Sequence, residues 1–235
     1  MLQDAMTYED LRPLLDKQPH PACVVLECPH REIGGKVTSM EDIRRISEHC
    51  RRLGVALHMD GARLWEASAH YDLNILNSLF DSIYVSFYKG LGGLAGAMLL
   101  GSDDFIASSR VWLRRFGGNI FTMLPYAVSA WKGLRTHATA FTPRLHHLQR
   151  VVAHITSVVD SSLVFFDPPA PVVSLVHVYM KCDVDTALRL RQLVLEETGV
   201  WCFQRARTAR FGASDYCYFE MNMVCSMPIY LLTLV

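Results

Sequence analysis

The sequence has no excess of charge of either sign. Its 235 residues include 23 lysines and arginines against 23 aspartates and glutamates, so the formal net charge is zero. Binding to nucleic acid or to an anionic membrane surface depends on an excess of positive charge, so neither partner is expected. The paired arginines stand next to apolar residues, a pattern typical of solvated helix faces (Arg44–Arg45, Arg51–Arg52 and Arg114–Arg115).

Cysteine pairs and long apolar runs are also missing. The seven cysteines form an odd set without C-x-x-C spacing, so they indicate neither a disulfide framework nor a zinc site, and no metal is expected. No stretch approaches the roughly 20 apolar residues of a membrane span, and the first residues do not resemble a signal peptide. We therefore expect a cytoplasmic protein. The apolar tail, residues 221–235, is interpreted as a strand, a core segment or the end of a truncated chain.

The first part of the chain alternates between strand and helix patterns. Residues 39–53 have helical spacing of apolar side chains, with Ser39 and Asp42 as a capping box. The flanking runs are apolar throughout, which is typical of strands covered on both faces of a parallel sheet. The alternation predicts an α/β fold with a mainly parallel sheet and flanking helices. The predicted strands are 22–27, 55–59, 82–87 and 96–100, and the predicted helices are 7–16, 102–116, 124–137 and 143–158.

The pattern changes towards the end of the chain. Three prolines between residues 168 and 171 make a stiff connection to a strand at 172–181, a helix at 184–198 and a strand at 200–203. We predict a large domain over residues 1–140, and a linking helix with a smaller C-terminal α+β domain over residues 141–235.

A glycine cluster at residues 90–95 has the spacing G-x-G-x-x-A of a dinucleotide-binding loop. That site needs a helix N-terminus directly after the glycines to hold the pyrophosphate, and here a short apolar strand follows. We therefore interpret the glycines as positions where the backbone turns sharply or passes close to a bulky group.

Asp60 ends a strand that looks buried, which places a carboxylate where open α/β sheets bind ligands. The simpler alternative is that Asp60 and Gly61 form a turn and that Asp60 caps a helix beginning near Ala62. His58 lies two residues earlier on the same strand face. It either donates a hydrogen bond to Asp60 or is a core histidine with partners elsewhere.

Lys89 follows the next predicted strand and precedes the glycine cluster. A lone lysine in a loop is usually a solvated charge, but one in a desolvated site can form a Schiff base with an aldehyde. About one strand–helix–strand unit separates Lys89 from Asp60, so both should lie at carboxyl ends of strands. A lysine and a carboxylate in this arrangement suit pyridoxal 5'-phosphate, whose aldehyde binds the lysine and whose pyridine nitrogen pairs with the carboxylate.

These residues resemble the threonine aldolase and aromatic amino acid β-eliminating lyase family of fold type I pyridoxal phosphate enzymes. The resemblance rests on HMDGAR at 58–63 and SFYKGLGG at 86–93, supported by ECPHREIGG at 27–35 and WLRRFGGN at 112–119. It covers residues 22–134 well and extends more loosely to residue 203. The combined length and spacing make it far more specific than either motif alone.

The resemblance implies a role for each matching residue. Lys89 would hold the cofactor, Asp60 would pair with the pyridine nitrogen, and His58 would support the cofactor site. Arg63 would bind the substrate carboxylate or the cofactor's phenolic oxygen, and His30 is the best candidate for the catalytic base. The implied reaction is retro-aldol cleavage of L-threonine or a related β-hydroxy-α-amino acid into glycine and an aldehyde. The implied assembly is a homodimer or homotetramer.

The chain also departs from this family. Family chains begin well before the position that matches Met1, and that segment supplies phosphate-binding and ring-stacking groups, so we expect a chain truncated at its N-terminus. At the other end, Arg207 and Arg210 are candidates for a carboxylate-binding arginine. Two further hypotheses stay open: an inactive remnant of the family, and a fold type I enzyme that performs β-elimination or transamination.

Overall fold

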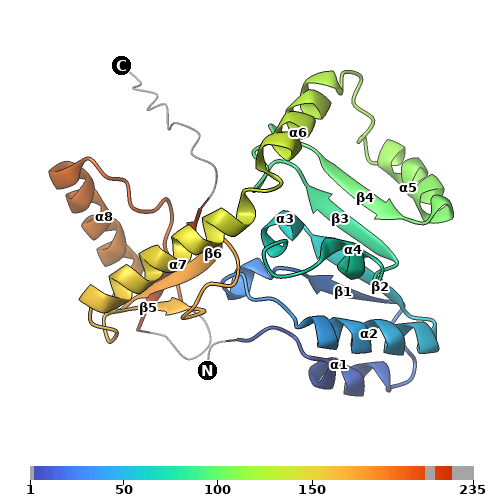
Figure 1. Cartoon of the computed structure of the whole chain (residues 1–235), viewed down its shortest axis with the longest axis horizontal. Coiled ribbons are helices and arrows are strands. Elements are labelled where there is room, and N and C mark those ends of the chain that lie inside the picture. Colours follow the sequence, from blue (N-terminus) through green and yellow to red (C-terminus); the bar gives the residue numbers. More distant parts are fainter. Residues whose placement is uncertain (1–2, 210–214, 224–235) are drawn as a thin grey trace.

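The described part of the chain folds around two four-stranded sheets (Figure 1). The structure is a computed structural model that describes residues 3–209 and 215–223. The first sheet has the order β1-β2-β3-β4 and is formed by β1 (Cys23–Glu27), β2 (Ala56–Gly61), β3 (Ser82–Ser86) and β4 (Ala97–Gly101). Strands β1, β2 and β3 are parallel, as the apolar runs predict, so the α/β class is confirmed.

Four helices cover one face of this sheet. They are α1 (Tyr8–Leu15), α2 (Met40–Leu53), α3 (Leu64–Ala67) and α4 (Leu73–Asn77), and their apolar side chains form one core with the inward side chains of β1, β2 and β3. Ile43 and Ile46 of α2 are completely buried in it. Ser39 accepts a hydrogen bond from the Asp42 backbone, but the Asp42 carboxylate accepts from the Ser39 hydroxyl and from the Tyr8 backbone. The second half of the predicted capping box is therefore replaced by a contact that joins α1 to α2.

The prediction that these strands are covered on both faces is wrong. Burial alternates along β1 and β2, so every second side chain is exposed or half-exposed. The reason is that α1 to α4, which share a core with these strands, pack on one face. The uncovered face carries Val25, His58, Asp60 and Tyr84, so polar groups are brought together on an accessible surface.

Strand β4 differs from the parallel arrangement that the sequence predicts. It runs antiparallel to β3, and all five of its residues are exposed. The connection from β3 to β4 contains turns and no helix, and a parallel neighbour would need a crossover connection. β4 therefore forms an edge, followed by α5 (Asp103–Arg115) and α6 (Leu124–His137).

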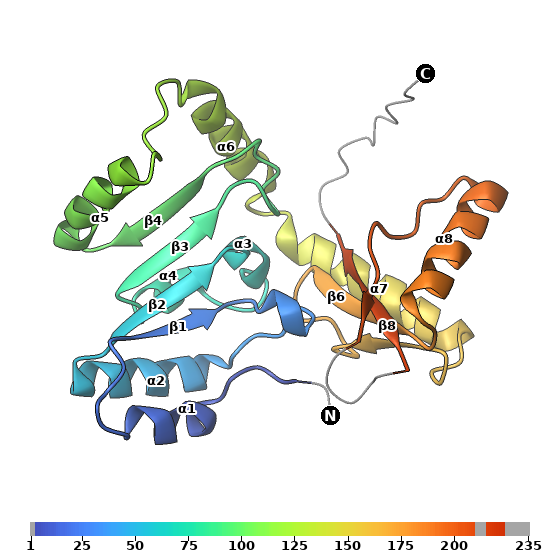
Figure 2. The same cartoon turned by 180° about the vertical axis from the view of Figure 1, so that it is seen from behind.

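The second sheet is antiparallel throughout and has the order β5-β6-β8-β7. Its strands are β5 (Val164–Asp167), β6 (Leu175–Met180), β7 (Arg207–Thr208) and β8 (Cys217–Asn222). The long helix α7 (Phe141–Val158) and helix α8 (Val184–Thr198) pack against it, with Leu148 and Ala187 completely buried. Figure 2 shows α6 and α7 running from the first sheet to the second.

Residues 200–203 do not form the strand that the sequence predicts. Their aromatic side chains pack instead, Trp201 beneath the Arg191 guanidinium at 4.1 Å and Phe203 against Phe219 with ring centroids 4.4 Å apart. Arg210, and the part of the apolar tail after residue 223, lie outside the described residues. Within the described ranges, no helix is long and apolar enough to cross a bilayer.

Candidate active site

A cavity of about 710 Å³ opens at the carboxyl ends of β1 and β2. Asp60, His30 and Glu27 line it, so two of the residues predicted from the sequence share one space. Glu27 ends β1 and accepts a hydrogen bond from the Arg31 backbone at 3.0 Å, which fixes the turn that carries His30. His30 Nε2 lies 3.7 Å from Glu27 Oε2, and within the described ranges its buried Nδ1 has no hydrogen-bond partner. This histidine thus has one carboxylate neighbour and one unsatisfied nitrogen.

Asp60 occupies the end of β2, next to Gly61. Its Oδ1 accepts a hydrogen bond from the Ala62 backbone at 3.0 Å. The alternative that Asp60 and Gly61 form a turn is wrong, because both residues belong to β2 and the turn follows at Ala62 and Arg63. The alternative that Asp60 caps the following helix is wrong, because α3 begins at Leu64 with Arg63 as its N-cap. A β-carbon at Gly61 would lie 2.7 Å from the Tyr84 carbonyl oxygen, so a glycine is needed for β2 and β3 to pair closely here.

His58 shares the accessible sheet face with Asp60, as the strand alternation predicts. Its described partner, however, is Ser82 on the neighbouring strand, with 2.7 Å between Nδ1 and Oγ. Residues two apart on a strand lie about 6 to 7 Å from one another, whereas Ser82 lies directly across the sheet. The structure therefore favours the interpretation in which His58 has its partner elsewhere.

Lys89 lies in a tight turn just beyond β3 and is half-buried. The Gly92 backbone donates to the Lys89 carbonyl at 2.8 Å, and the Gly93 backbone donates to the Phe87 carbonyl at 2.7 Å. A β-carbon at Gly90 would come within 2.8 Å of the Phe141 ring. The prediction that these glycines allow a sharp turn and a close approach is confirmed, and a strand follows the turn instead of a helix.

Two tyrosines, Tyr84 and Tyr88, lie near the ends of β2 and β3. Tyr84 pairs with Asp60 in the register of β2 and β3, and its hydroxyl oxygen lies 3.4 Å from that of Tyr88. Lys89 Nζ lies 5.6 Å from the Tyr88 ring centroid. Burial raises the pKa of Tyr84 to about 12, with the hydrogen bond to Tyr88 and the nearby Tyr88 and Asp60 adding to the rise. Both tyrosines were missed from the sequence, although the register of two adjacent parallel strands could have indicated Tyr84.

Arg63 lies in a chain of alternating charges that reaches the second sheet. Its Nε is 3.7 Å from Glu66 Oε1, and its Nη2 is 3.8 Å from Glu220 Oε1 on β8. Glu220 Oε2 also accepts a hydrogen bond from Arg31 at 2.6 Å. Glu66 and Glu220 were missed from the sequence, because only the tertiary fold brings them to Arg63.

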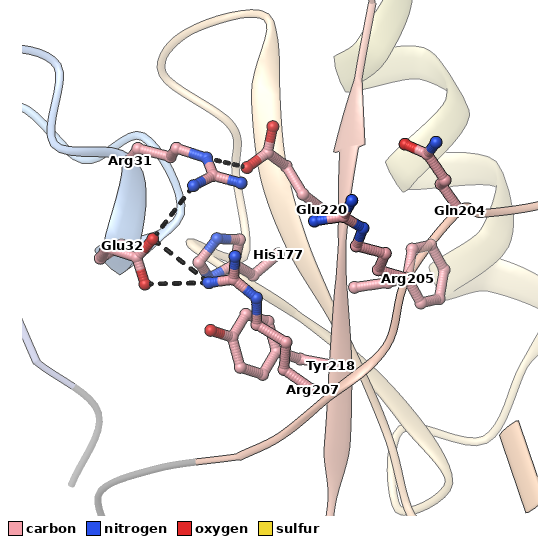
Figure 3. Close-up of a pocket in the computed structure, with 9 residues that line it drawn as sticks. Arg31, Glu32, His177, Gln204, Arg205, Arg207, Tyr218 and Glu220 are labelled. Atoms are coloured by element: carbon pink, nitrogen blue, oxygen red, sulfur yellow. Dashed lines mark hydrogen bonds and ion pairs between the residues drawn. The ribbon is translucent and has the colours of Figure 1, made fainter. Parts of the chain in front are cut away.

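Glu220 also lines a second, smaller cavity of about 320 Å³ (Figure 3). It is lined by basic and acidic side chains, which include Arg31, Glu32, Arg205 and Arg207. Arg207, a predicted carboxylate-binding residue, is paired with Glu32 at 3.3 Å. Its charge is therefore already balanced by a neighbour.

Comparison with known proteins identifies the family of this chain. The profile of the beta-eliminating lyase family matches residues 2–182, which is more than half of the chain. This chain belongs to the beta-eliminating lyase family. Membership confirms the resemblance seen in the sequence, and with it the fold type I class of pyridoxal phosphate enzymes.

Individual members of this family are similar over part of their length. An aldolase named vrtJ from Penicillium aethiopicum is 44% identical over 100 residues, which are 41% of this chain and 25% of the relative. A low-specificity L-threonine aldolase from Candida albicans is 35% identical over 117 residues, 49% of this chain and 30% of the relative. The chain thus matches well under half of the length of these curated relatives.

Solved structures of family members match more of the chain. A putative L-allo-threonine aldolase from Listeria monocytogenes is 33% identical with a TM-score of 0.85, over 94% of this chain and 60% of that protein. A putative aromatic amino acid beta-eliminating lyase/threonine aldolase from Exiguobacterium is 32% identical with a TM-score of 0.82. Both sheets of this chain therefore have counterparts in one known fold.

The residues at the candidate site fit a pyridoxal group. A half-buried primary amine lies just past the end of β3, and a carboxylate lies at the end of β2, the adjacent parallel strand. Two phenols, Tyr84 and Tyr88, contact each other nearby, and within the described ranges the Nε of Arg63 is buried without a hydrogen-bond partner. An amine, a carboxylate and a guanidinium with spare donor capacity are groups that bind an aldehyde, a pyridine nitrogen and an anionic oxygen.

Proposed function

We propose that this chain forms the lysine-bearing part of a pyridoxal phosphate-dependent carbon–carbon lyase. Its substrate would be L-threonine or a related β-hydroxy-α-amino acid, and its products glycine and an aldehyde. The observation that carries the proposal is that Asp60 ends β2 and that Lys89 follows the carboxyl end of β3, the adjacent parallel strand. The names of the similar aldolases support this choice of substrate class.

In this proposal Lys89 and Asp60 hold the cofactor. When bound, pyridoxal phosphate supplies an electron-withdrawing ring that stabilises negative charge on the α-carbon of the substrate. Asp60 would place a negative charge opposite the pyridine nitrogen and retain a proton there. Burial raises the pKa of Tyr84 from 10 to about 12, so this hydroxyl, like that of an ordinary tyrosine, is protonated at neutral pH and can donate a hydrogen bond.

The other predicted residues would bind and deprotonate the substrate. Arg63 would orient the substrate carboxylate through its guanidinium. His30 would accept the proton of the β-hydroxyl, and Glu27 beside it would stabilise the resulting positive charge. A carboxylate next to a histidine is a common means of orienting the imidazole for this role.

We further propose that the protein self-associates in the cytoplasm as a homodimer or homotetramer. The exposed Val25 on the accessible face of the first sheet, and the exposed Met98 and Leu100 on the edge strand β4, support this. Sedimentation velocity should give a mass of two or four chains. A single species with the mass of one chain across the micromolar range would contradict the proposal.

The cofactor assignment is tested by covalent capture. The purified chain is incubated with pyridoxal phosphate and reduced with borohydride, and the modified lysine is identified by mass spectrometry. We expect the pyridoxyl group on Lys89, its loss in Lys89→Ala and its retention in Lys132→Ala, a matched change at an exposed lysine. Equal labelling of both lysines in the native chain would refute the assignment and favour an inactive remnant.

The reaction is tested by product analysis. Release of glycine and acetaldehyde from L-threonine supports the lyase, whereas release of pyruvate from L-serine would identify a β-eliminating enzyme instead. Labelling at Lys89 without either product would separate cofactor binding from turnover.

A further inference from the structure

A buried carboxylate lies beside the turn that carries Lys89. Glu66 belongs to α3 and is only 2% exposed. A β-carbon added at Gly90 would come within 3.3 Å of Glu66 Oε1, so the carboxylate packs against the residue that follows Lys89. Burying an ionised carboxylate costs free energy unless neighbouring donors or positive charges stabilise it. The groups around Glu66 therefore determine whether its carboxylate is ionised.

On one side Glu66 faces Arg63, one helical turn earlier. The separation of 3.7 Å between Arg63 Nε and Glu66 Oε1 is an ion-pair distance but too long for a hydrogen bond. Both atoms are buried, and neither has a hydrogen-bond partner within the described ranges. Two buried groups of opposite charge, each with an unsatisfied atom, are thus a small movement away from a direct hydrogen bond.

On the other side Glu66 contacts the second half of the chain. The Ser174 hydroxyl donates to Glu66 Oε2 at 3.3 Å, and the pair is buried. The Arg144 guanidinium, on α7, donates to the Gly90 carbonyl at 2.9 Å, on the same turn that Glu66 packs against. The carboxylate therefore lies where α3, the Lys89 turn and the segment before β6 meet.

We propose that Glu66 is a positioning residue of the candidate site, which holds both the Arg63 guanidinium and the backbone turn that carries Lys89. The inference rests on the proposed function, because that function assigns substrate and cofactor binding to these two groups. Glu66 would act through them and would touch neither ligand.

The protonation state of Glu66 would set the position of Arg63. Burial raises the pKa of Glu66 to about 7, with Glu220 adding to the rise and with Arg63, Ser174 and Arg144 opposing it. The ionised carboxylate attracts Arg63, whereas the neutral acid leaves the guanidinium to Glu220, 3.8 Å away. Around neutral pH the arginine would therefore move between the two carboxylates.

The test follows the side-chain Nε–H signal of Arg63 and the backbone amide signals of Lys89 and Gly90 by NMR, in the full chain without cofactor. In the native protein we expect all three to titrate together with a midpoint near pH 7, at the pKa of Glu66. Glu66→Gln, which keeps the shape and a polar partner for Ser174, should abolish this titration. The exposed Glu48→Gln should leave it unchanged. Identical profiles in the native and Glu66→Gln proteins would overturn the proposal.

A second measurement uses the cofactor. The dissociation constant of pyridoxal phosphate, measured by fluorescence, should rise roughly tenfold in Glu66→Ala, because the ion pair with Arg63 and the packing against the Lys89 turn are both lost. It should recover only in part in Glu66→Gln, which restores the packing but not the charge. An unchanged constant in Glu66→Ala would count against the role at the Lys89 turn. If the native chain does not bind the cofactor at all, the proposed function fails, and the NMR titration alone decides the position of Arg63.

Discussion

Replacing Glu66 with glutamine should change how the stability of the fold depends on pH. The carboxyl group has an ordinary pKa of 4.5, and burial raises it to about 7 in the folded chain. The folded state therefore binds this proton more tightly than the unfolded state does. The stabilisation is fully present below pH 4.5 and is lost as the pH rises through about 7.

The size of the effect follows from this pKa difference. Each unit of difference corresponds to about 1.4 kcal/mol, so the native protein should lose roughly 2 to 3 kcal/mol of unfolding free energy between pH 5 and pH 8 through this one group. Glu66→Gln cannot titrate and lacks this loss. Subtracting the unfolding free energy of Glu66→Gln from that of the native protein cancels the contributions of ionisable groups that the two proteins share.

Urea unfolding at several pH values between 5 and 8 measures the difference directly. The unfolding free energy of the native protein minus that of Glu66→Gln should fall steadily over this range, with the steepest change between pH 5 and 7. Glu48→Gln serves as the matched control, because its carboxylate is exposed. Parallel curves for the native and Glu66→Gln proteins would refute the reasoning, since they would mean that Glu66 titrates alike in the folded and unfolded states.

Two further predictions concern packing. Gly90→Ala should destabilise the fold by about 1 to 3 kcal/mol and weaken labelling of Lys89, because the new methyl group would lie 2.8 Å from the Phe141 ring. Adding Phe141→Leu to this variant should restore part of the stability and part of the labelling. A Gly90→Ala protein of native stability would contradict the described turn. Leu148→Ala, at a fully buried position of the second core, should lower the free energy of unfolding in urea by about 2 to 5 kcal/mol. Leu190→Ala, at a half-exposed position of α8, should lower it by less than about 1 kcal/mol. Equal losses in the two variants would contradict the assignment of the core.

The placement of Asp60 and Lys89 at the carboxyl ends of two adjacent strands could be predicted because the information is local. Each follows a short apolar run, and strands joined by a helical connection pair in parallel and end at the same edge of a sheet. Helix α2, which connects β1 to β2, was recognisable from its periodicity, whereas the short helices α3 and α4 between β2 and β3 were not predicted. The family motifs add chemistry at positions that the strand pattern had already brought together.

The environment of the strands could not be predicted in the same way. An apolar run such as residues 96–100 has the same sequence pattern whether it is buried in a sheet or lies at its edge, and here β4 is an exposed antiparallel edge. Residues 200–203 have strand-forming side chains, but Trp201 and Phe203 gain more contact by packing on Arg191 and Phe219. In both cases tertiary contacts decide the outcome.

The charges around Arg63 show why the candidate site extends beyond its motifs. Glu66 is bonded to Ser174, 108 residues away, and Arg31 to Glu220, 189 residues away, so no spacing rule relates them. Arg63 lies at nearly equal distances, 3.7 and 3.8 Å, from the carboxylates of Glu66 and Glu220. A substrate carboxylate arriving at this guanidinium would add a third negative charge to a largely buried group.

Binding of a substrate carboxylate at Arg63 becomes more favourable when Glu66 or Glu220 takes up a proton, because one negative charge is then removed. Glu66 is the one suited to do so, because it is buried and its pKa is raised to about 7, whereas Glu220 has a hydrogen bond from Arg31. Substrate binding and protonation of Glu66 should therefore be linked. A proton taken up by the native protein on binding a carboxylate ligand, and not by Glu66→Gln, would be detected by calorimetry in buffers of different ionisation enthalpy.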